Sequence, residues 1–463
     1  MEADVQRFTA DSNALPFPPA GSRRGTRLMQ AGAWALIYVL LAAFPLMALL
    51  LGPIPTGGGF GWDFAMAVGF GGLAIMGLQL VLTARFRRAT APFGIDIIYY
   101  FHRWAAVGGL ALLVAHYAII RVEYSSALGS ANPLVAPGHM TAGRVALGLF
   151  AVVIATSLWR KQLGTNYDTW RLWHGVMAMT AVVLAIWHIQ GVGHYTRAPW
   201  KGAVWFGYSA FWILVLGYLR VLKPLQLLRH PYRVLDVRQE TAAVWTVTLA
   251  PEHPPVLAFR PGQFAWLTLG ANPFCAKEHP FSFSGSAANS KSLRFTIKEL
   301  GDFTRTIKQV RFGAVVYVNG PHGAFTTDFH RHAPGFVLVA GGVGIAPIMS
   351  MLRTLADRRD RRPLYLIYGN WNWEGLLFRD EIEALKSRLN LTVAHVLQEP
   401  PPGWPGATGF VTEKLLRATI PPGATDHVCF LCGPKAMTDS VSRSLRRLRF
   451  PLHRIHFELF EMA

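Results

Sequence analysis

Four histidines inside apolar segments are the residues of this chain whose type and spacing could support redox chemistry. His102 and His116 lie in one segment, and His174 and His188 lie in another, with 14 positions between the members of each pair. Fourteen positions turn a helix by about 1400°, roughly 40° short of four turns, so both rings of a pair lie on one face. Their axial separation of about 21 Å suits two sites near opposite sides of a hydrocarbon core about 30 Å thick.

A histidine inside a membrane is energetically costly and normally has a partner. If both segments run in the same direction, His102 meets His174 near the cytoplasmic side and His116 meets His188 near the outer side. Each facing pair could supply two axial imidazoles to one haem iron. The alternatives are four unrelated core histidines, which leave the equal spacing unexplained, and a metal-ion transporter, which leaves the second half of the chain unexplained.

Membrane-spanning helices must position these histidines, and six apolar runs are long enough to serve. Basic residues follow the second, fourth and sixth runs, among them Arg87, Arg160 and Lys223. The positive-inside rule then predicts that both termini face the cytoplasm. The first run lacks a cleavage signal and reads as a retained anchor. The predicted spans are Gln30–Leu51, Trp62–Thr83, Ile98–Ile120, Thr141–Trp159, Leu172–Gln190 and Ala203–Leu222.

The composition agrees with a membrane domain joined to a soluble one. Hydrophobic residues make up 52% of the 463 residues, charged residues make up 15%, and the net charge is +19. That excess is typical of membrane topology and anionic lipid surfaces. No nucleic-acid-reading motif accompanies it, so nucleic acid is not an expected partner. The three cysteines, Cys275, Cys429 and Cys432, exclude a disulfide framework, and a lone CxxC does not predict a zinc site. We find no internal sequence repeat.

The second half of the chain predicts two further domains. Short alternating segments, Trp245–Leu249, Phe264–Leu269 and Leu293–Ile297, predict an antiparallel β-barrel. Beyond Gly335, strands alternate with helical patterns, which predicts a doubly wound parallel α/β sheet. We therefore divide the chain into a cytoplasmic N-terminal tail (1–27), a six-span transmembrane di-haem domain (28–224), an antiparallel β-barrel domain (225–332) and an α/β domain (333–463).

The β-barrel segment contains two motifs. Arg260–Phe264 is followed by His279-Pro280-Phe281-Ser282, and Ile297–Thr304 comes later. Together they resemble the FAD-binding barrel of the ferredoxin–NADP reductase superfamily, in the His-Pro-Phe-Ser form of ferric reductases and NADPH oxidases. The resemblance implies that Phe281 packs on the isoalloxazine, that Ser282 hydrogen-bonds near its reactive nitrogen, and that His279 lies near the pyrophosphate. In the second motif, backbone amides and Thr304 would cradle the pyrophosphate.

The α/β segment contains a glycine-rich loop, Gly341-Gly342-Val343-Gly344-Ile345-Ala346-Pro347, between an apolar strand and a helix. That context brings amides and a positive helix end to a pyrophosphate. With Cys432-Gly433-Pro434 on a later strand, the loop resembles the nicotinamide domain of the same superfamily, which would place Cys432 beside the nicotinamide. Glu458-Leu459-Phe460 resembles the aromatic ending of NADPH oxidases, in which the ring covers the flavin.

Residues 30 to 463 as a whole resemble a bacterial member of the ferric reductase and NADPH oxidase superfamily. The resemblance implies electron transfer from cytoplasmic NAD(P)H, through FAD and two b-type haems, to a small acceptor across the inner (plasma) membrane, in contact with membrane lipid. It assigns catalytic roles to Ser282, Cys432 and Phe460. The haem ligands would be His102, His116, His174 and His188. The FAD and nicotinamide contacts would be His279, Pro280, Phe281, Ser282, Lys298, Gly301, Thr304, Gly323, Gly341, Gly342, Gly344, Pro347, Cys432, Gly433, Pro434 and Phe460.

Two choices stay open at this point. Eukaryotic NADPH oxidases place a further histidine one turn beyond the outer ligand, where this chain has Ile120, which favours a ferric chelate over oxygen as acceptor. A quinone or a partner protein is a further alternative. No arginine follows Tyr368-Gly369, which favours NADH over NADPH, although Arg379 could contribute.

Overall fold

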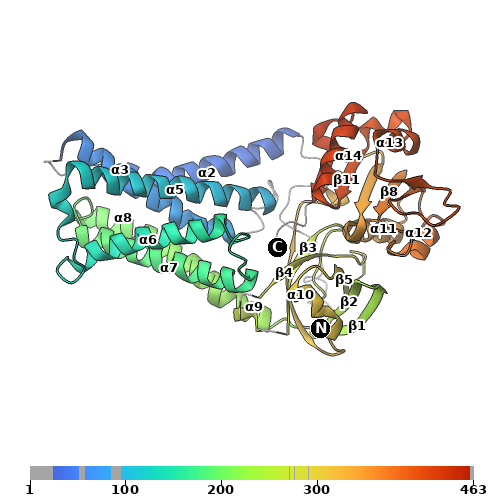
Figure 1. The fold of residues 1–463 in the computed structure, drawn as a ribbon, viewed down its shortest axis with the longest axis horizontal. Coiled ribbons are helices and arrows are strands. Elements are labelled where there is room, and N and C mark those ends of the chain that lie inside the picture. The colour runs from blue at the N-terminus through green and yellow to red at the C-terminus, as the bar shows by residue number, and fades with distance from the viewer. Residues whose placement is uncertain are drawn as a thin grey trace, which may run out of the picture. The chain divides into compact units, whose positions relative to one another are not determined.

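The computed structural model describes residues 24–51, 58–84, 95–270, 272–275, 277–289 and 291–458. The chain separates into two compact units. Arg24–Pro224 forms one unit, and Leu225–Ala463 makes up most of the other. Figure 1 shows that the first unit is helical and that the second contains the sheets.

Among the described residues, six helices are long and apolar enough to cross a membrane, as the sequence predicted, and the chain is a multi-pass membrane protein. Five are continuous, and the last span combines α8 with a π-helical turn and α9. The helices are α2 (Arg24–Leu50), α3 (Gly59–Thr83), α5 (Ile95–Glu123), α6 (Gly138–Leu158), α7 (Tyr167–Val192), α8 (Pro199–Gly217) and α9 (Lys223–Leu228).

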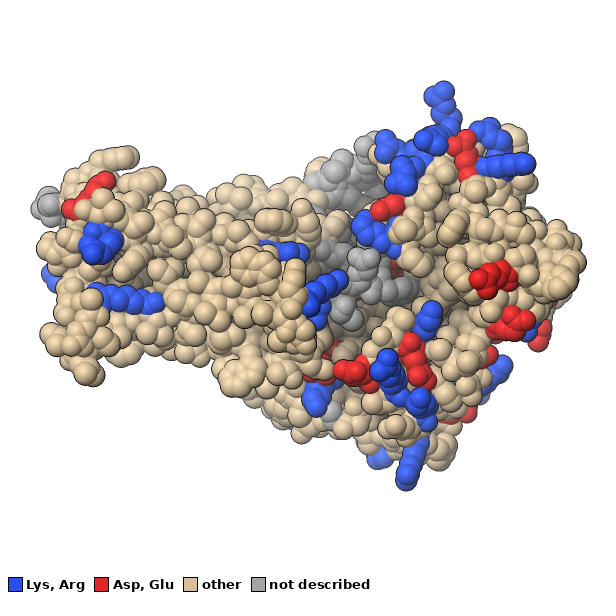
Figure 2. Space-filling model, viewed as in Figure 1, with Lys and Arg blue, Asp and Glu red and all other residues tan. Residues whose placement is uncertain are grey.

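The surface of these helices is apolar, as a lipid-facing surface requires. Many large apolar side chains are exposed, including Leu40, Val183 and Leu214. On the face drawn in Figure 2, the middle of the helical region is almost free of charged side chains, whereas Lys, Arg, Asp and Glu are numerous on the other unit. Helix α7 begins at Asn166, whose side chain accepts bonds from the amides of Asp168 and Thr169, and it ends at Gly193 in the left-handed conformation.

The second unit begins with a six-stranded antiparallel sheet in the order β4-β3-β6-β1-β2-β5. Phe283, the residue after the edge strand β4, forms an isolated bridge with Phe295 of the other edge strand, β5. The antiparallel prediction is confirmed. The strands are β1 (Tyr232–Thr241), β2 (Val244–Pro251), β3 (Phe264–Leu269), β4 (His279–Ser282), β5 (Leu293–Lys298) and β6 (Val315–His322), with the short helix α10 (Asp302–Arg305) after β5.

A six-stranded parallel sheet follows in the order β10-β9-β8-β7-β11-β12, as predicted. Its central strand β7 is buried along its whole length, which is why it reads as a continuous apolar run. The strands are β7 (Phe336–Gly341), β8 (Leu364–Asn370), β9 (Leu391–Leu397), β10 (Ala407–Thr408), β11 (Val428–Cys432) and β12 (Ile455–Glu458), and the helices are α11 (Ile345–Asp357), α12 (Arg379–Leu385), α13 (Glu413–Thr419) and α14 (Lys435–Arg447).

Candidate functional site

Helices α5 and α7 bring the first histidine pair, His102 and His174, together. Their ring centroids are 6.5 Å apart, with an interplanar angle of 62°. An imidazole nitrogen lies about 2 Å from a metal that it ligates and about 1.1 Å from its ring centre, so two axial rings on one metal have centroids about 6 Å apart. The separation of the first pair therefore fits two ligands of one haem iron.

The second histidine pair, His116 and His188, lines one cavity within the helical unit. The Nδ1 atom of His116 lies 2.8 Å from the Ala65 carbonyl oxygen, and that of His188 lies 3.0 Å from the His139 carbonyl oxygen. A carbonyl only accepts, so each Nδ1 carries the proton and each Nε2 keeps its lone pair. A hydrogen bond of this kind fixes the tautomer that a metal ligand needs.

The two hydrogen bonds of the second pair come from a repeated arrangement of helices. Helix α3 supports α5 as α6 supports α7: His139 lies 74 positions after Ala65, and His188 lies 72 positions after His116. Gly69 and Gly143, each four residues beyond the accepting carbonyl, complete the repeat. A Cβ atom at these glycines would lie 2.8 Å and 2.7 Å from the respective Nδ1 atoms. Both glycines therefore provide the space that the imidazole rings occupy.

The described residues contain no group of three or more His, Cys, Asp or Glu side chains that could hold a metal ion. Haem iron needs only two protein ligands, because the macrocycle supplies the other four. The second histidine pair offers two such ligands, with both Nδ1 atoms protonated. The cavity around this pair is lined by apolar residues such as Phe70 and Phe150, which suits the apolar macrocycle.

In the antiparallel sheet, β4 carries the first predicted flavin motif. Ser282 pairs with Phe264 of β3 and is 4% exposed, and its hydroxyl has no hydrogen-bond partner among the described residues. A buried hydroxyl without a partner is costly, so this one fits a group that is bound from outside. The ring of His279 stacks on Phe303 with centroids 3.8 Å apart, and Phe281 lies 6.0 Å from the same ring.

The second flavin motif forms an ordered turn at the start of α10. Thr304 Oγ1 accepts hydrogen bonds from the amides of Leu300 and Gly301 at 2.8 Å and 2.9 Å. The threonine hydroxyl therefore shapes this loop, whereas Lys298 and Gly301 are exposed. Just after β6, the carbonyl of Gly323 accepts a bond of 2.9 Å from the side chain of Gln263, which lies just before β3, so this bond ties the adjoining ends of β3 and β6 together.

The glycine-rich loop and the Cys432-Gly433-Pro434 turn meet at the carboxyl edge of the parallel sheet. Ala340 of β7 pairs with Cys432 of β11, so the segments after these strands are adjacent. A Cβ atom at Gly344 would clash with the Cys432 carbonyl oxygen, and one at Gly433 would lie 3.1 Å from the Gly341 backbone. At this edge Gly342 adopts φ +54°, and Pro347 lies in the first turn of α11. Open α/β sheets bind nucleotides at the carboxyl ends of their strands.

Cys432 is fully buried at the end of β11. Burial and the neighbouring Glu458 carboxylate raise the pKa of its thiol well above the usual range, so it stays protonated near neutral pH. Glu458 pairs with Cys432 in the sheet register and approaches the site of Gly323 in the antiparallel sheet. The flavin and nicotinamide motifs therefore meet around Glu458, which is 7% exposed.

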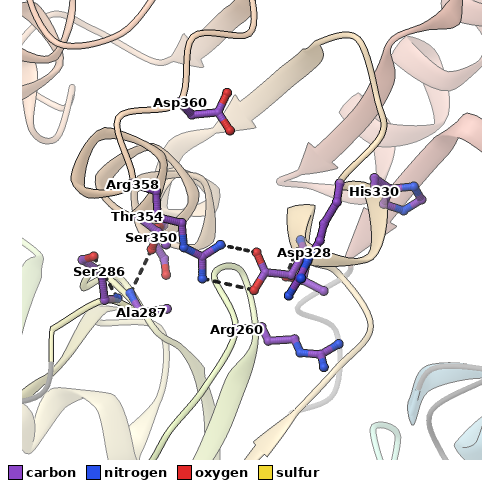
Figure 3. Close-up of polar contacts among 12 residues, drawn as sticks. Arg260, Ser286, Ala287, Asp328, His330, Ser350, Thr354, Arg358 and Asp360 are labelled. Atoms are coloured by element: carbon purple, nitrogen blue, oxygen red, sulfur yellow. Dashed lines mark hydrogen bonds and ion pairs between the residues drawn. The ribbon is translucent and has the colours of Figure 1, made fainter. Parts of the chain in front are cut away.

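Helix α11 joins the two sheets through polar contacts, shown in Figure 3. Arg358 pairs with Asp328 at 2.5 Å and 3.2 Å, and the amide of Ala287 donates to Thr354 Oγ1 at 2.8 Å. On the same helix, the buried Arg353 donates to the Ser284 carbonyl and pairs with Glu381 of α12. The glycine-rich loop and the flavin motif are thus held by one helix.

Phe460 lies outside the described residues, as does most of the predicted N-terminal tail. The sequence analysis did not assign a role to three contributors to the site. They are Glu458, Phe303, and the backbone carbonyls and glycines of α3 and α6 that support the second histidine pair. Glu458 and Phe303 lie within motifs that the sequence analysis identified, so their positions in the sequence could have indicated a role in the site. The backbone carbonyls of Ala65 and His139 offered none, because any residue carries one.

The chain matches two family models. Residues 68–185, which include His102, His116 and His174, match a ferric reductase like transmembrane component, and residues 338–443 match an oxidoreductase NAD-binding domain. The resemblance found in the sequence is confirmed for these segments. The chain joins a ferric reductase-like transmembrane domain to a reductase module with the fold that binds FAD and NAD(P)H.

Similar proteins cover only part of this chain. NADH-cytochrome b5 reductase 1 of Laccaria bicolor is 34% identical over 164 residues, 33% of this chain and 51% of that protein. Its counterpart in Aspergillus terreus is 31% identical over 173 residues, 35% of this chain and 57% of that protein. This chain thus spans about half the length of these curated relatives.

Among solved structures, the ferredoxin reductase in carbazole 1,9a-dioxygenase is 24% identical with a TM-score of 0.44, over 50% of this chain and 69% of that one. The cytochrome b5 reductase domain of Ulva prolifera nitrate reductase is 18% identical with a TM-score of 0.44, over 49% of this chain and 96% of that one.

Proposed function

We propose that this protein is a transmembrane oxidoreductase that moves electrons from cytoplasmic NAD(P)H through FAD and two b-type haems to an acceptor on the outer face, with a ferric chelate as the acceptor. The proposal rests on one observation: α5 and α7 form two histidine pairs in the same chain as the reductase module. The proposed domains are 28–224 for the di-haem bundle, 225–332 for FAD and 333–463 for the nicotinamide.

The residues of this chain position the cofactors. When bound, FAD takes two electrons from the nicotinamide and releases them singly, as haem iron requires. The Ser282 hydroxyl, which has no partner among the described residues, would donate toward the bound flavin, and the protonated Cys432 thiol would lie at the nicotinamide end of the sheet. His102 with His174, and His116 with His188, would each hold one haem iron. Buried apolar side chains around the second pair exclude water.

The choice of a ferric chelate over oxygen rests on the residue one turn beyond His116. Ile120 is 4% exposed and lines the same cavity as His116 and His188. An isoleucine offers no hydrogen bond to a reduced oxygen species, whereas reduction of a ferric chelate needs only electron transfer. Oxygen, a quinone or a partner protein would be the acceptor if NADH-reduced protein reoxidised with one of them and not with ferric citrate.

The end of the parallel sheet favours NADH over NADPH. The indole N–H of Trp371, just after β8, donates at 3.0 Å to the carboxylate of Glu399, just after β9. Arg379 lies 4.6 Å from the ring of Trp373 and is engaged there. A carboxylate at this edge accepts bonds from a ribose hydroxyl and repels a 2′-phosphate. We expect Glu399→Gln to raise kcat/KM for NADPH relative to NADH by about tenfold, with the exposed Glu383→Gln as the matched control.

The test of the proposed function is an anaerobic absorption spectrum of the purified protein with FAD, before and after NADH. The expected result is two haems per chain, both reduced by NADH, with loss of one haem when His102 or His174 is replaced. A haem-free protein, or haem that NADH leaves oxidised, would overturn the proposal.

A further inference from the structure

The two histidine pairs differ in what their Nδ1 atoms bind, although their supporting helices repeat one pattern. In the second pair, both Nδ1 atoms donate directly to backbone carbonyls, at 2.8 Å and 3.0 Å. Fourteen residues beyond Gly69 and Gly143 along α3 and α6, the equivalent positions hold Thr83 and Ser157. Hydroxyl side chains thus replace the two glycines at the first pair.

Ser157 lies between His174 and the backbone. Its hydroxyl donates to the Val153 carbonyl at 2.6 Å, and its oxygen is 3.1 Å from His174 Nδ1. Because the hydroxyl proton is committed to the carbonyl, the oxygen accepts the proton of Nδ1. The serine therefore separates the imidazole from the type of carbonyl that the second pair contacts directly.

His102 receives still less support. Thr83 Oγ1 donates within its own helix, to Gln79 O at 3.0 Å. His102 Nδ1 is buried and has no hydrogen-bond partner among the residues that the structure describes. Among the described residues, the first pair therefore has one Nδ1 hydrogen bond, to a hydroxyl, whereas the second pair has two, both shorter and both to carbonyls.

This difference bears on the electronic character of the ligands. An Nδ1–H donated to a strong acceptor makes Nε2 more basic, and a more basic axial ligand stabilises oxidised iron. We propose that α3 and α6 set the two sites at different potentials, with the higher potential at the first pair, and that Ser157 is a positioning residue for His174. This inference rests on the proposed function, since it needs haem at both pairs.

Redox titration of the full chain in detergent, followed by haem absorbance, tests the inference without turnover. Ser157→Ala leaves His174 Nδ1 without an acceptor and raises the midpoint potential of one haem. Ser157→Gly reproduces the Gly143 arrangement, opens the Val153 carbonyl to His174 and lowers the same potential. At a fixed potential, each change alters the ratio of reduced to oxidised haem by about tenfold, and Ser157→Thr restores the wild-type value.

Thr180→Ala is the matched control, because this exposed hydroxyl of α7 bonds to Val176 O at 3.0 Å, four residues earlier in its own helix, as Ser157 bonds to Val153 O on α6. The affected haem must be the one that is lost in His174→Ala. Equal potentials for the two wild-type haems, or shifts of the same sign in the Ala and Gly variants, would overturn the inference and leave the proposed function standing. A wild-type chain without two haems would overturn both.

Discussion

Ser282 is the clearest residue-scale candidate for direct contact with the flavin, since its buried hydroxyl lacks a partner among the described residues. We expect Ser282→Ala to slow flavin reduction by NADH by about 10²-fold, because a positioned hydrogen bond to the reacting group is lost. Stopped-flow absorbance of the flavin measures this rate. Ser286→Ala, whose hydroxyl caps a loop turn through the Ala288 amide, is the control. Equal rates in the two variants would remove Ser282 from the reaction.

Gly143 makes a second prediction at the same scale. A methyl group there would lie 2.7 Å from His188 Nδ1, so Gly143→Ala should displace the ring and release one haem per chain. Gly148→Ala on the same helix meets nothing within 4 Å and should retain both haems, with helix stability unchanged or slightly improved. The ratio of haem to protein in each purified variant measures how many haems are retained. Two haems in the Gly143 variant would mean that this glycine does not shape the site.

Helix α11 is the element on which the geometry of the reductase module depends. Arg353 is 9% exposed and joins Glu381 of α12 to the Ser284 carbonyl beside the flavin motif. Removing its charge leaves Glu381 without its partner and the carbonyl without its donor. We expect Arg353→Leu to lower the free energy of unfolding by about 2 kcal/mol, allowing for solvent screening at the half-exposed glutamate. Thermal unfolding followed by flavin fluorescence measures this, and the exposed pair Arg388–Asp357 provides the control variant Arg388→Leu.

The same pair predicts a pH dependence. Although burial opposes it, the hydrogen bond and charge of Arg353 hold the pKa of Glu381 below its usual value. A carboxyl whose pKa is lower in the folded state contributes stability above its unfolded pKa, about 4.3, and loses it as pH falls through the folded pKa. The stability difference between wild type and Glu381→Gln should therefore be largest near pH 7 and shrink below about pH 4. A difference that is constant with pH would show that the pair does not titrate as a unit.

At the scale of the whole molecule, the four histidines and the reductase module should be separable by mutation. His116→Ala should lose one haem and abolish electron transfer across proteoliposome membranes, because the second site is the last before the acceptor. NADH-driven flavin reduction should persist, since its residues lie in another compact unit. Internal NADH with an external ferric chelate measures the first activity, and the exposed His230→Ala is the control. Retained transmembrane transfer would contradict the assignment of His116.

Much of the architecture could be predicted because it depends on local patterns. Apolar runs of membrane length, the 14-residue spacing of the histidines and the Gly-Gly-Val-Gly-Ile-Ala-Pro loop each follow from periodicity within one segment. The same holds for the antiparallel and parallel sheets, whose alternating and continuous apolar strands differ in sequence. These patterns indicated a multi-pass membrane domain joined to a reductase module.

The tertiary structure alone decided which distant groups support those residues. The carbonyls of Ala65 and His139 reach the second pair only because α3 packs on α5 and α6 packs on α7, and a backbone carbonyl has no sequence signature. The repeat of these helices is hard to find in the sequence because, apart from the histidines and Gly69 with Gly143, the equivalent positions that the site uses differ in identity, as Ala65 and His139 do. Glu458 lies beside Cys432 because β12 pairs with β11, and Arg353 of α11 donates to the Ser284 carbonyl. Local periodicity encodes neither of these contacts. The sequence determined which residues could bind cofactors, and long-range packing determined how their chemistry is set.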